Sequence, residues 1–221
     1  LHGPQVARLL AEFGEPLARL SPIEIRLAAQ VALTGHLPRV DQLTLDQLVG
    51  LSSKAVTKAA RRALGRLALV REPLTPKWLD WACGGASAES ELIKTIFLFG
   101  ADGTYRLHES IAAVAQSEHW LSTGEQESAH RELGGRYKAR FRSAATESDV
   151  PGLLRDEIEC VFHRTMGADP AVLEDSLYFA EQYDLIGRSL GQRGESLFRR
   201  GRKAPARAAL KQATTAYERA T

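Results

Sequence analysis

Apolar residues recur at helical spacing along most of this 221-residue chain, with short loops between the stripes. Near the start, the segment 6–13 carries such a stripe, and Gly14-Glu15-Pro16 ends it. The next helix begins after Ser21, because Ser21, Pro22 and Glu24 have the order of a capped helix N-terminus. The pattern therefore predicts a mainly α-helical chain.

Two further helices are predicted before the first strand. Thr44 and Gln47 repeat the capping pattern and open a short helix that runs through Leu51. Ser52 or Ser53 is expected to cap the helix after that one. The inward face of this third helix is predicted to be Val56, Ala60, Ala63, Leu64 and Leu67. The segment 69–71 is then predicted to be a strand.

A β-hairpin followed by a helix is predicted over 95–115. β-branched and aromatic residues fill 95–99, turn residues fill 100–103, and 104–107 forms the second strand. Glu109 lies in the first turn of the helix, where the macrodipole favours a carboxylate, and His108 stands at the joint between strand and helix. Three helices with such a hairpin predict a winged helix-turn-helix.

The segment 73–94 is an insertion that a minimal winged helix does not need. Thr75 and Pro76 begin a helix in it, which Gly84-Gly85 ends, and 87–94 is predicted to form another short helix. Trp78 and Trp81 lie on the first of these helices, where we expect them to pack in the core.

The second half of the chain is predicted to be helical throughout. A long helix covers 124–144, and 147–151 is expected to be a boundary. Helices over 153–166 and 170–183 are predicted to form a helical hairpin. His163 has apolar neighbours and is expected to be a packed side chain, whereas His119 and His130 fit no pattern.

Composition narrows the functional classes. The chain is 44% hydrophobic and 25% charged with a formal net charge of +2, so neither nucleic acid nor an anionic membrane is demanded as a partner. No apolar run approaches the roughly 20 residues of a membrane span, and no secretory signal is visible. Cys83 and Cys160 are far apart, which fits a reducing compartment, so we expect a cytoplasmic protein. Because the chain begins at Leu1 and ends within a helical pattern, we also expect it to be a piece of a longer protein.

The sequence lacks the signatures of common catalytic sites. It has no Gly-x-x-x-x-Gly-Lys-Ser/Thr loop to hold nucleotide phosphates, no Gly-x-Ser-x-Gly turn, and no Cys or His cluster at zinc-binding spacing. We therefore expect no enzymatic activity, cofactor or metal in this chain alone.

The segment from Tyr105 to Ala115 resembles the end of the winged-helix domain in STAND NTPases. These signal-transduction ATPases include apoptosome scaffolds, NLR immune receptors and many bacterial regulators. In that family the histidine of this motif contacts the β-phosphate of ADP on a neighbouring nucleotide-binding domain. The resemblance therefore nominates Leu107, His108 and Glu109 as nucleotide-sensing residues, with Glu109 in place of the usual Asp.

The segment 187–220 resembles a tetratricopeptide repeat, whose period is about 34 residues. Lys203 replaces the usual aromatic residue at its seventeenth position, and the proline near its end is missing. The resemblance implies a terminal or degenerate repeat, followed by others, that binds protein partners. With Gly187 as its first position, residues that let the two helices of a repeat interlock are Leu190, Gly194, Leu197, Gly201, Ala206, Leu210 and Ala213.

These expectations divide the chain into four parts. They are the tail of a preceding helical segment (1–20), a winged-helix domain (21–119), a connecting helix (120–150) and tetratricopeptide-like helical hairpins (151–221). The resemblance implies a regulatory role in signal transduction, in which the winged helix senses ADP or ATP bound to an adjacent nucleotide-binding domain.

A DNA-binding transcriptional regulator is the alternative. The third helix is the recognition helix of a helix-turn-helix, and it is expected to carry Lys54, Lys58, Arg61 and Arg62. Asn and Gln, which read base edges, are absent between Ser53 and Leu67. We therefore expect a solvated basic face, and we do not expect nucleic acid as the partner.

Overall fold

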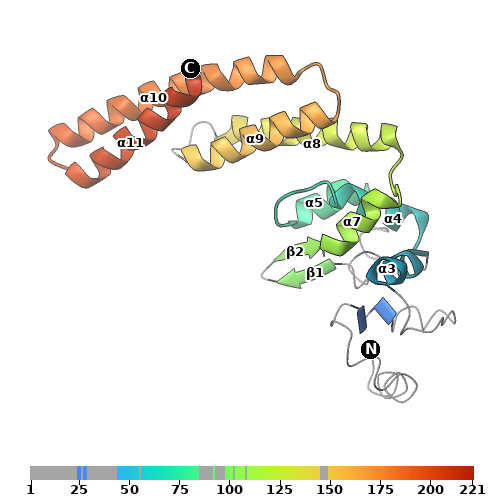
Figure 1. Ribbon diagram of the computed structural model, residues 1–221. Coiled ribbons are helices and arrows are strands. Elements are labelled where there is room, and N and C mark those ends of the chain that lie inside the picture. The colour runs from blue at the N-terminus through green and yellow to red at the C-terminus, as the bar shows by residue number, and fades with distance from the viewer. Residues whose placement is uncertain are drawn as a thin grey trace. The chain divides into compact units, whose positions relative to one another are not determined.

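The computed structural model of the chain is mainly α-helical and forms two compact units, Leu1–Thr123 and Gly124–Thr221 (Figure 1). It describes residues 24–25, 27–28, 44–54, 56–84, 92, 98–101, 103–107, 109–144 and 149–221. The predicted predominance of helix is confirmed. The expected helix within 1–20, most of the helix after Ser21, and nearly all of 87–94 lie outside the described residues.

The first unit combines helices with a β-hairpin. Helix α7 packs against α3 and α4, and α5 packs against α4. Each of these four helices contributes a fully buried side chain: Leu48, Leu64, Leu79 and Ile111. The elements are α3 (Leu45–Lys54), α4 (Lys58–Leu67), α5 (Pro76–Cys83), β1 (Leu98–Ala101), β2 (Thr104–Leu107) and α7 (Glu109–Ser117).

The predicted capping box before α3 is confirmed. The backbone N–H of Gln47 donates to Thr44 Oγ1 at 3.3 Å, and the N–H of Thr44 donates to Gln47 Oε1 at 2.9 Å. These reciprocal bonds satisfy two backbone donors at the end of the helix, where no helical carbonyl is available. Helix α3 continues three residues beyond the predicted end at Leu51.

The predicted cap of α4 is wrong. Ser52 and Ser53 both lie inside α3, and Thr57 is the capping residue, since its Oγ1 accepts the Ala60 N–H at 3.2 Å. Ser52 is buried instead, and its hydroxyl donates to the Leu27 carbonyl at 3.4 Å. The residues predicted to face inward are all buried: Val56, Ala60, Ala63, Leu64 and Leu67.

Helix α5 agrees with its prediction. Pro76 occupies the first turn, and Gly84 ends the helix with φ +61°, a left-handed conformation that favours glycine. Trp78 and Trp81 are buried, and their rings meet edge to face with centroids 5.9 Å apart. Both tryptophans therefore pack in the core as expected.

The turn of the β-hairpin is tighter than predicted. β1 and β2 pair antiparallel with Ala101 opposite Thr104, so Gly100 and Ala101 belong to the strand and two residues connect the strands. Gly103 has φ +75°, and two-residue hairpin turns need such left-handed residues because their twist matches that of the strands.

The predicted strand over 69–71 is not a strand. The N–H groups of Leu69 and Val70 donate to the carbonyls of Arg66 and Leu67 at 3.1 and 3.0 Å, so the chain turns tightly after α4. The extended contact comes later, at Leu74, which exchanges backbone hydrogen bonds of 2.9 and 2.6 Å with Tyr105. β2 therefore lies between β1 and Leu74.

Four described helices build the second unit. Helix α8 agrees with the helix predicted over 124–144, and it packs side chains against both α9 and α10, although we expected a connecting helix over 120–150. Helix α10 joins the predicted helix over 170–183 to the one expected from Gly187, because 184–186 contains no helix breaker. The bounds are α8 (Thr123–Ala144), α9 (Val150–Met166), α10 (Val172–Arg199) and α11 (Lys203–Ala220).

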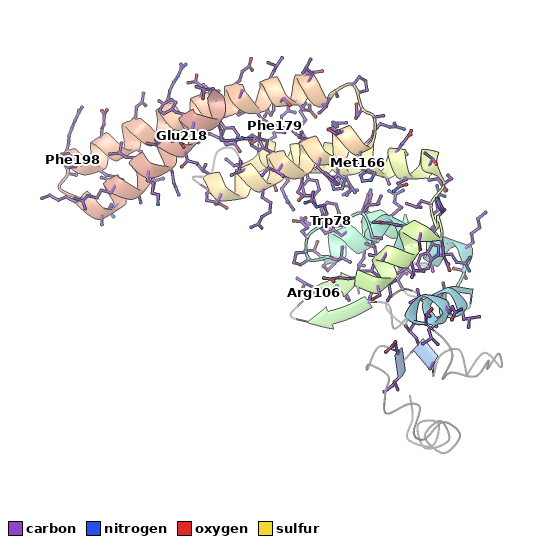
Figure 2. The ribbon with its side chains drawn as sticks, in the orientation of Figure 1. Trp78, Arg106, Met166, Phe179, Phe198 and Glu218 are labelled. Carbon is purple, nitrogen blue, oxygen red and sulfur yellow. The ribbon has the colours of Figure 1, made fainter. Side chains whose placement is uncertain are left out.

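Aromatic rings form the core of the second unit. Phe141 of α8 lies 4.6 Å from Phe179 and 5.5 Å from Tyr183 of α10, measured between ring centroids, and all three are fully buried. Phe198, near the end of α10, is 61% exposed, in contrast to Phe179 on the same helix (Figure 2). Within the described ranges, no helix has both the length and the apolar character needed to cross a membrane.

Candidate functional site

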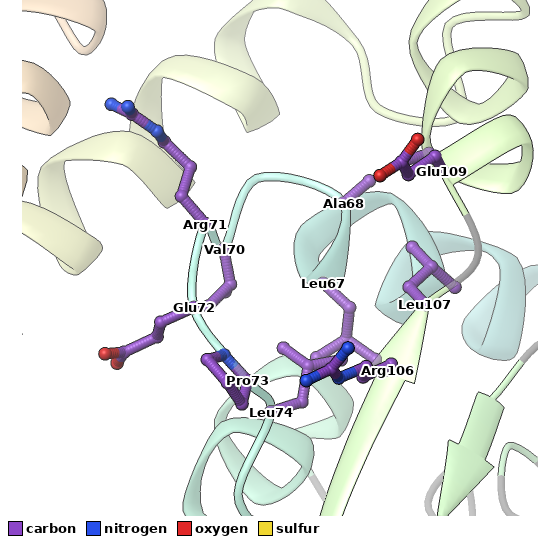
Figure 3. Close-up of a pocket in the computed structure, with 11 residues that line it drawn as sticks. Leu67, Ala68, Val70, Arg71, Glu72, Pro73, Leu74, Arg106, Leu107 and Glu109 are labelled. Atoms are coloured by element: carbon purple, nitrogen blue, oxygen red, sulfur yellow. The ribbon is translucent and has the colours of Figure 1, made fainter.

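The predicted nucleotide-sensing residues lie where β2 meets α7. Leu107 ends β2 and is half-buried, and Glu109 begins α7 and is exposed. His108, between them in the sequence, lies outside the described residues. Leu107 and Glu109 both line one cavity of about 390 Å³ (Figure 3).

This cavity has apolar walls and charged side chains around it. The walls come from the end of α4, the loop that follows, β2 and the first turns of α7. A volume of several hundred Å³ with a few polar groups is typical of small-molecule sites. The apolar lining includes Leu67, Val70, Leu74, Leu107 and Ala112, and the charged residues are Arg71, Glu72, Arg106 and Glu109 (Figure 3).

Tryptophans of the 73–94 insertion support the cavity wall. Trp78 Nε1 donates to Glu72 Oε1 at 2.9 Å, which ties the loop after α4 to α5. The Arg66 guanidinium lies 4.4 Å from the ring centroid of Trp81, in cation–π geometry. The insertion therefore holds in place the loop that carries Arg71 and Glu72.

The basic residues of the DNA-binding alternative do not share one helix. Lys58, Arg61 and Arg62 lie on α4, with Lys58 and Arg62 exposed. Lys54 is the last residue of α3, so its expected place on the recognition helix is wrong, and its side chain is outside the described part. This difference follows from the cap at Thr57, which starts α4 later than predicted.

The tetratricopeptide-like residues lie on α10, on α11 and in the turn between them. Leu190, Gly194, Ala206 and Ala213 are buried, and Leu197 is half-buried. Leu210 is 40% exposed. Gly201 is in the turn with φ +75°, so it permits the turn and is not part of the helix interface.

Glycines let α10 and α11 approach closely. The two helices lie side by side and antiparallel (Figure 1). A Cβ on Gly194 would lie 2.7 Å from Leu210 Cγ, and one on Gly187 would lie 2.9 Å from Tyr217 Cδ1. Both separations are shorter than side chains tolerate, so a larger residue at either position would require the Leu210 or Tyr217 side chain to move or the helices to separate.

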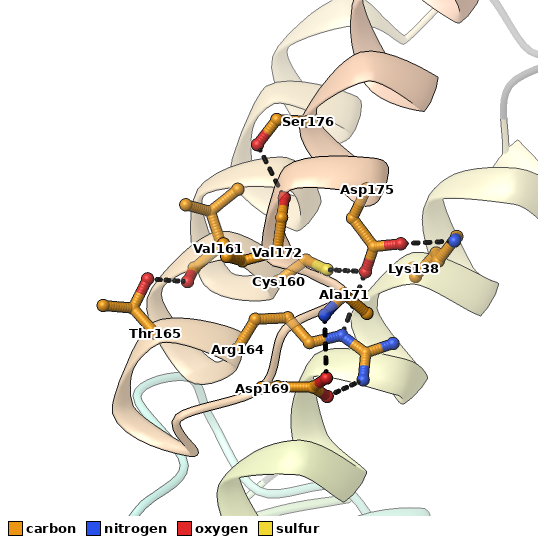
Figure 4. Close-up of polar contacts among 10 residues, drawn as sticks. All are labelled: Lys138, Cys160, Val161, Arg164, Thr165, Asp169, Ala171, Val172, Asp175 and Ser176. Atoms are coloured by element: carbon orange, nitrogen blue, oxygen red, sulfur yellow. Dashed lines mark hydrogen bonds and ion pairs between the residues drawn. The ribbon is translucent and has the colours of Figure 1, made fainter.

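A buried charge cluster, which the sequence did not predict, joins α8, α9 and α10. Asp175 of α10 is fully buried, and its carboxylate accepts hydrogen bonds from Lys138 Nζ of α8 and, at 2.9 Å, from Arg164 Nε of α9 (Figure 4). Arg164 also binds Asp169, just before α10. Cys160 Sγ lies 3.7 Å from Asp175 Oδ2.

The cluster shifts the pKa values of its members. Burial, and then the Asp175 carboxylate, raise the pKa of the Cys160 thiol to about 12, so this thiol is not a nucleophile at neutral pH. Burial alone would lower the pKa of Arg164, but its bonds to Asp169 and Asp175 raise it. Burial alone would raise the pKa of Asp169, but the Ala171 N–H and Arg164 lower it.

A second polar cluster joins α9, α10 and α11. Arg219 of α11 forms an ion pair with Glu157 of α9. Burial, and then the nearby Glu157 carboxylate, raise the pKa of the Tyr183 phenol. The role of Arg219 and Glu157 is therefore structural, because their ion pair joins α11 to α9.

The buried histidines show what sequence reasoning missed. His163 is fully buried, as predicted, but His130 is buried against it, although no pattern was assigned to it. The signal was present, because His130 precedes Leu133, Tyr137 and Phe141 at helical spacing along the buried face of α8. Asp175 carried no such signal, since an acidic residue in a first helical turn usually faces solvent.

No protein-family model matches the chain, and neither the curated proteins nor the solved structures include a significant match. In the described part of the chain, no three His, Cys, Asp or Glu side chains cluster so that they could hold a metal ion.

Proposed function

We propose that this chain is the regulatory segment of a STAND-type signalling NTPase that acts in the cytoplasm. The first unit is its winged-helix nucleotide sensor, and the second unit is a tetratricopeptide-like region that binds protein partners. One observation carries the proposal: Leu107 and Glu109, which the family motif nominates on either side of His108, line the same cavity. Leu107 and Glu109 therefore border a concave surface of the first unit, and the proposal takes this surface as the face toward the nucleotide.

In this mechanism an adjacent domain binds ADP and the cavity face of the first unit covers its phosphates. The family motif implies that the His108 imidazole donates a hydrogen bond to the β-phosphate. Arg71 and Arg106 border the cavity together with Glu72 and Glu109, so these four side chains carry no net formal charge, and the mechanism relies on the His108 hydrogen bond. In the closed state the adjacent domain would cover this face, and the exclusion of water would strengthen the hydrogen bond to the phosphate.

The packing of α10 and α11 supports the role of the second unit. In a tetratricopeptide register that begins at Gly187, Gly194 and Leu210 are expected to interlock, and these two residues meet in the structure. A partner bound to this unit can activate the protein only if it binds the open state more tightly than the closed one. The chain itself performs no chemistry in this mechanism.

The substitution His108→Ala in the full-length protein tests the proposal. A hydrogen bond to a charged group contributes about 1.5–3 kcal/mol, so its loss should accelerate ADP dissociation roughly 10- to 100-fold. The measurement is the dissociation rate of fluorescent ADP, together with thermal unfolding of the present chain. Unfolding should change little, because the phosphate partner is absent from the chain alone.

The matched control is His119→Asn, which removes an exposed histidine just after α7, away from the cavity. It should leave ADP dissociation unchanged. If His108→Ala costs the isolated chain several kcal/mol while the dissociation rate is unaffected, His108 is a structural residue. A full-length protein that binds no nucleotide would refute the proposal as a whole.

The alternative function is DNA binding by the first unit. The short connection between α3 and α4 and the exposed Lys58 and Arg62 on α4 favour it. Titration of the chain into labelled duplex DNA separates the two functions. Nonspecific affinity, typically 10⁻⁴ to 10⁻⁶ M at physiological salt, agrees with the nucleotide sensor, whereas nanomolar sequence-dependent binding would replace it.

A further inference from the structure

Two buried histidines face each other between α8 and α9. His130 is 3% exposed and His163 is fully buried, and their Nδ1 atoms lie 2.7 Å apart. The His163 ring stacks on Tyr137 with centroids 5.6 Å apart and planes 6° from parallel. Phe162 meets both imidazoles edge to face. The two rings are thus held in contact by aromatic side chains around them.

The short contact limits how many protons the pair can carry. A neutral imidazole has one N–H and one acceptor nitrogen, whereas a charged imidazolium has two N–H groups and no acceptor. A 2.7 Å separation of His130 and His163 requires one Nδ1 to donate and the other to accept. If both rings were charged, two N–H groups would point at each other. The folded pair therefore takes up at most one proton beyond the neutral state.

The Glu159 carboxylate favours one assignment of donor and acceptor in the pair. His163 Nε2 lies 3.7 Å from Glu159 Oε2 on α9, which favours a proton on Nε2 and leaves His163 Nδ1 as the acceptor. His130 Nδ1 is then the donor.

The neighbouring charges on each helix are engaged in other contacts. On α8, Arg140 binds Asp156 of α9 and its guanidinium lies 4.8 Å from the Tyr137 ring centroid, and Arg131 donates to the Gly167 carbonyl at 2.7 Å. On α9, Arg164 binds Asp175 of α10, whose other oxygen binds Lys138. These charges are therefore directed at partners other than the imidazoles.

We propose that the His130–His163 pair is an acid-sensitive contact between α8 and α9. When both rings become protonated, this contact breaks and the second unit opens. In the unfolded chain each imidazole takes up a proton as the pH falls through about 6.5. The folded unit binds at least one proton fewer than the unfolded chain. Burial also lowers the pKa of His130, and this likewise disfavours proton uptake by the folded unit.

The direction of the pH effect follows from proton linkage. Because the unfolded state binds more protons, stability is full above about pH 7 and falls as the pH decreases below 6.5. For each proton that only the unfolded chain binds, the unfolding equilibrium constant rises by up to tenfold as the pH falls by one unit. One such proton gives a rise of roughly 25-fold between pH 7 and pH 5. Ordinary carboxylates remain ionised in this window, so they contribute little.

The test measures opening of the second unit through Cys160, which is fully buried in it. The Cys83→Ser variant leaves Cys160 as the one thiol, and its rate of modification is measured with a pyridyl disulfide that reacts in acid. Dividing this rate by the rate for an unfolded peptide removes the pH dependence of the reagent. We expect this ratio to rise at least ~25-fold from pH 7 to 5. All three tryptophans, Trp78, Trp81 and Trp120, lie in the first unit, so their fluorescence shows whether that unit stays folded.

The double variant His130→Leu/His163→Phe removes the titrating pair and keeps apolar volume. Its rise between pH 7 and 5 should be less than about threefold, and the control His119→Asn should retain the wild-type rise. Equal profiles for wild type and double variant would overturn the proposal.

If the double variant does not fold, NMR of labelled imidazoles in the wild-type protein decides. At least one ring of the pair should stay neutral at pH 5.5 while the chain remains folded. Two charged rings in the folded protein would overturn the proposal.

Discussion

The two halves of α10 are held to their neighbours by different interactions. The first half carries Asp175, a fully buried carboxylate that binds Lys138 of α8 and Arg164 of α9. The second half carries Gly187 and Gly194, where the missing Cβ atoms let α11 approach. One helix therefore combines a contact made by charge with a contact made by shape.

This difference determines which changes each half tolerates. A buried charge is acceptable only while every partner is present, since removal of one leaves the others desolvated and uncompensated. A close contact through glycine has no partner to lose, but it fails when volume is added. The first half should therefore be sensitive to deletion of atoms, and the second half to their addition.

The largest expected effect is that of Asp175→Ala. It leaves Lys138 and Arg164 without their shared carboxylate, and removal of one partner from a buried pair costs about 3–5 kcal/mol. The measurement is urea unfolding followed by far-UV circular dichroism, with hydrogen exchange to locate the change in the contact region of α8, α9 and α10. Glu174→Ala, at the exposed neighbouring position, is the control and should cost less than about 1 kcal/mol. Similar losses in both variants would show that Asp175 does not hold the three helices together.

A pair of identical substitutions tests the second half of α10. Gly191→Ala should stabilise the chain by about 1 kcal/mol, because alanine has the higher helix propensity and its Cβ would meet nothing within 4 Å. Gly194→Ala gains the same propensity but forces its Cβ against Leu210, and overpacking costs about 1–3 kcal/mol. The two variants should differ by that amount in the free energy of unfolding. Equal stabilisation by both would mean that Leu210 moves aside without penalty and that the close approach at Gly194 does not limit the residue there.

The sequence predicted two helix ends that local chemistry decides. The capping box of Thr44 and Gln47 and the end of α5 at Gly84 depend on neighbouring residues, and both agree with the structure. The cap of α4 was misplaced because several hydroxyl residues, Ser52, Ser53 and Thr57, stand close together. Which of the three residues caps α4 depends on the burial of Ser52 against Leu27, and this is a tertiary contact.

The candidate sites divide in the same way. The resemblance to a tetratricopeptide repeat nominated seven residues for the contact between two helices, and Leu190, Gly194, Ala206 and Ala213 are buried. Leu197 is half-buried, Leu210 is 40% exposed, and Gly201 lies in the turn. No local rule joins Asp175 to Lys138, because 37 positions separate them and the pairing exists only once α8 and α10 pack together. Polar residues in a core are recognised from their partners, and a single sequence does not supply partners.

The smallest expected effect concerns the two turns that enter and leave α10. Both have the same hydrogen bonds: Asp169 N donates to Arg164 O at 2.9 Å before α10, and Arg202 N donates to Leu197 O at 2.9 Å after it. This pattern is a Schellman motif, which needs a left-handed residue just after the helix end. Gly201 provides it with φ +75°, but Ala168 provides it in the first turn with φ +47°.

The glycine of the first turn stands one position too early because another contact needs it. A Cβ on Gly167 would lie 2.9 Å from Arg131 Cγ and 3.0 Å from the Glu127 carbonyl, so close packing on α8 requires glycine there. The strained position therefore falls to Ala168. For a residue other than glycine, a left-handed conformation costs about 1–2 kcal/mol.

Exchanging the residues of these turns tests whether conformation alone sets their stability. Ala168→Gly relieves the backbone strain but also raises the conformational entropy of the unfolded chain. A net stabilisation of about 0.5–1 kcal/mol is therefore expected. Gly201→Ala should destabilise by a similar amount, because its Cβ would meet nothing within 4 Å and only the backbone angle matters. Thermal unfolding of the two variants checks both signs. If Ala168→Gly is destabilising instead, the Ala168 side chain contributes packing to the charge-held half of α10, and that half depends on more than its ion pairs.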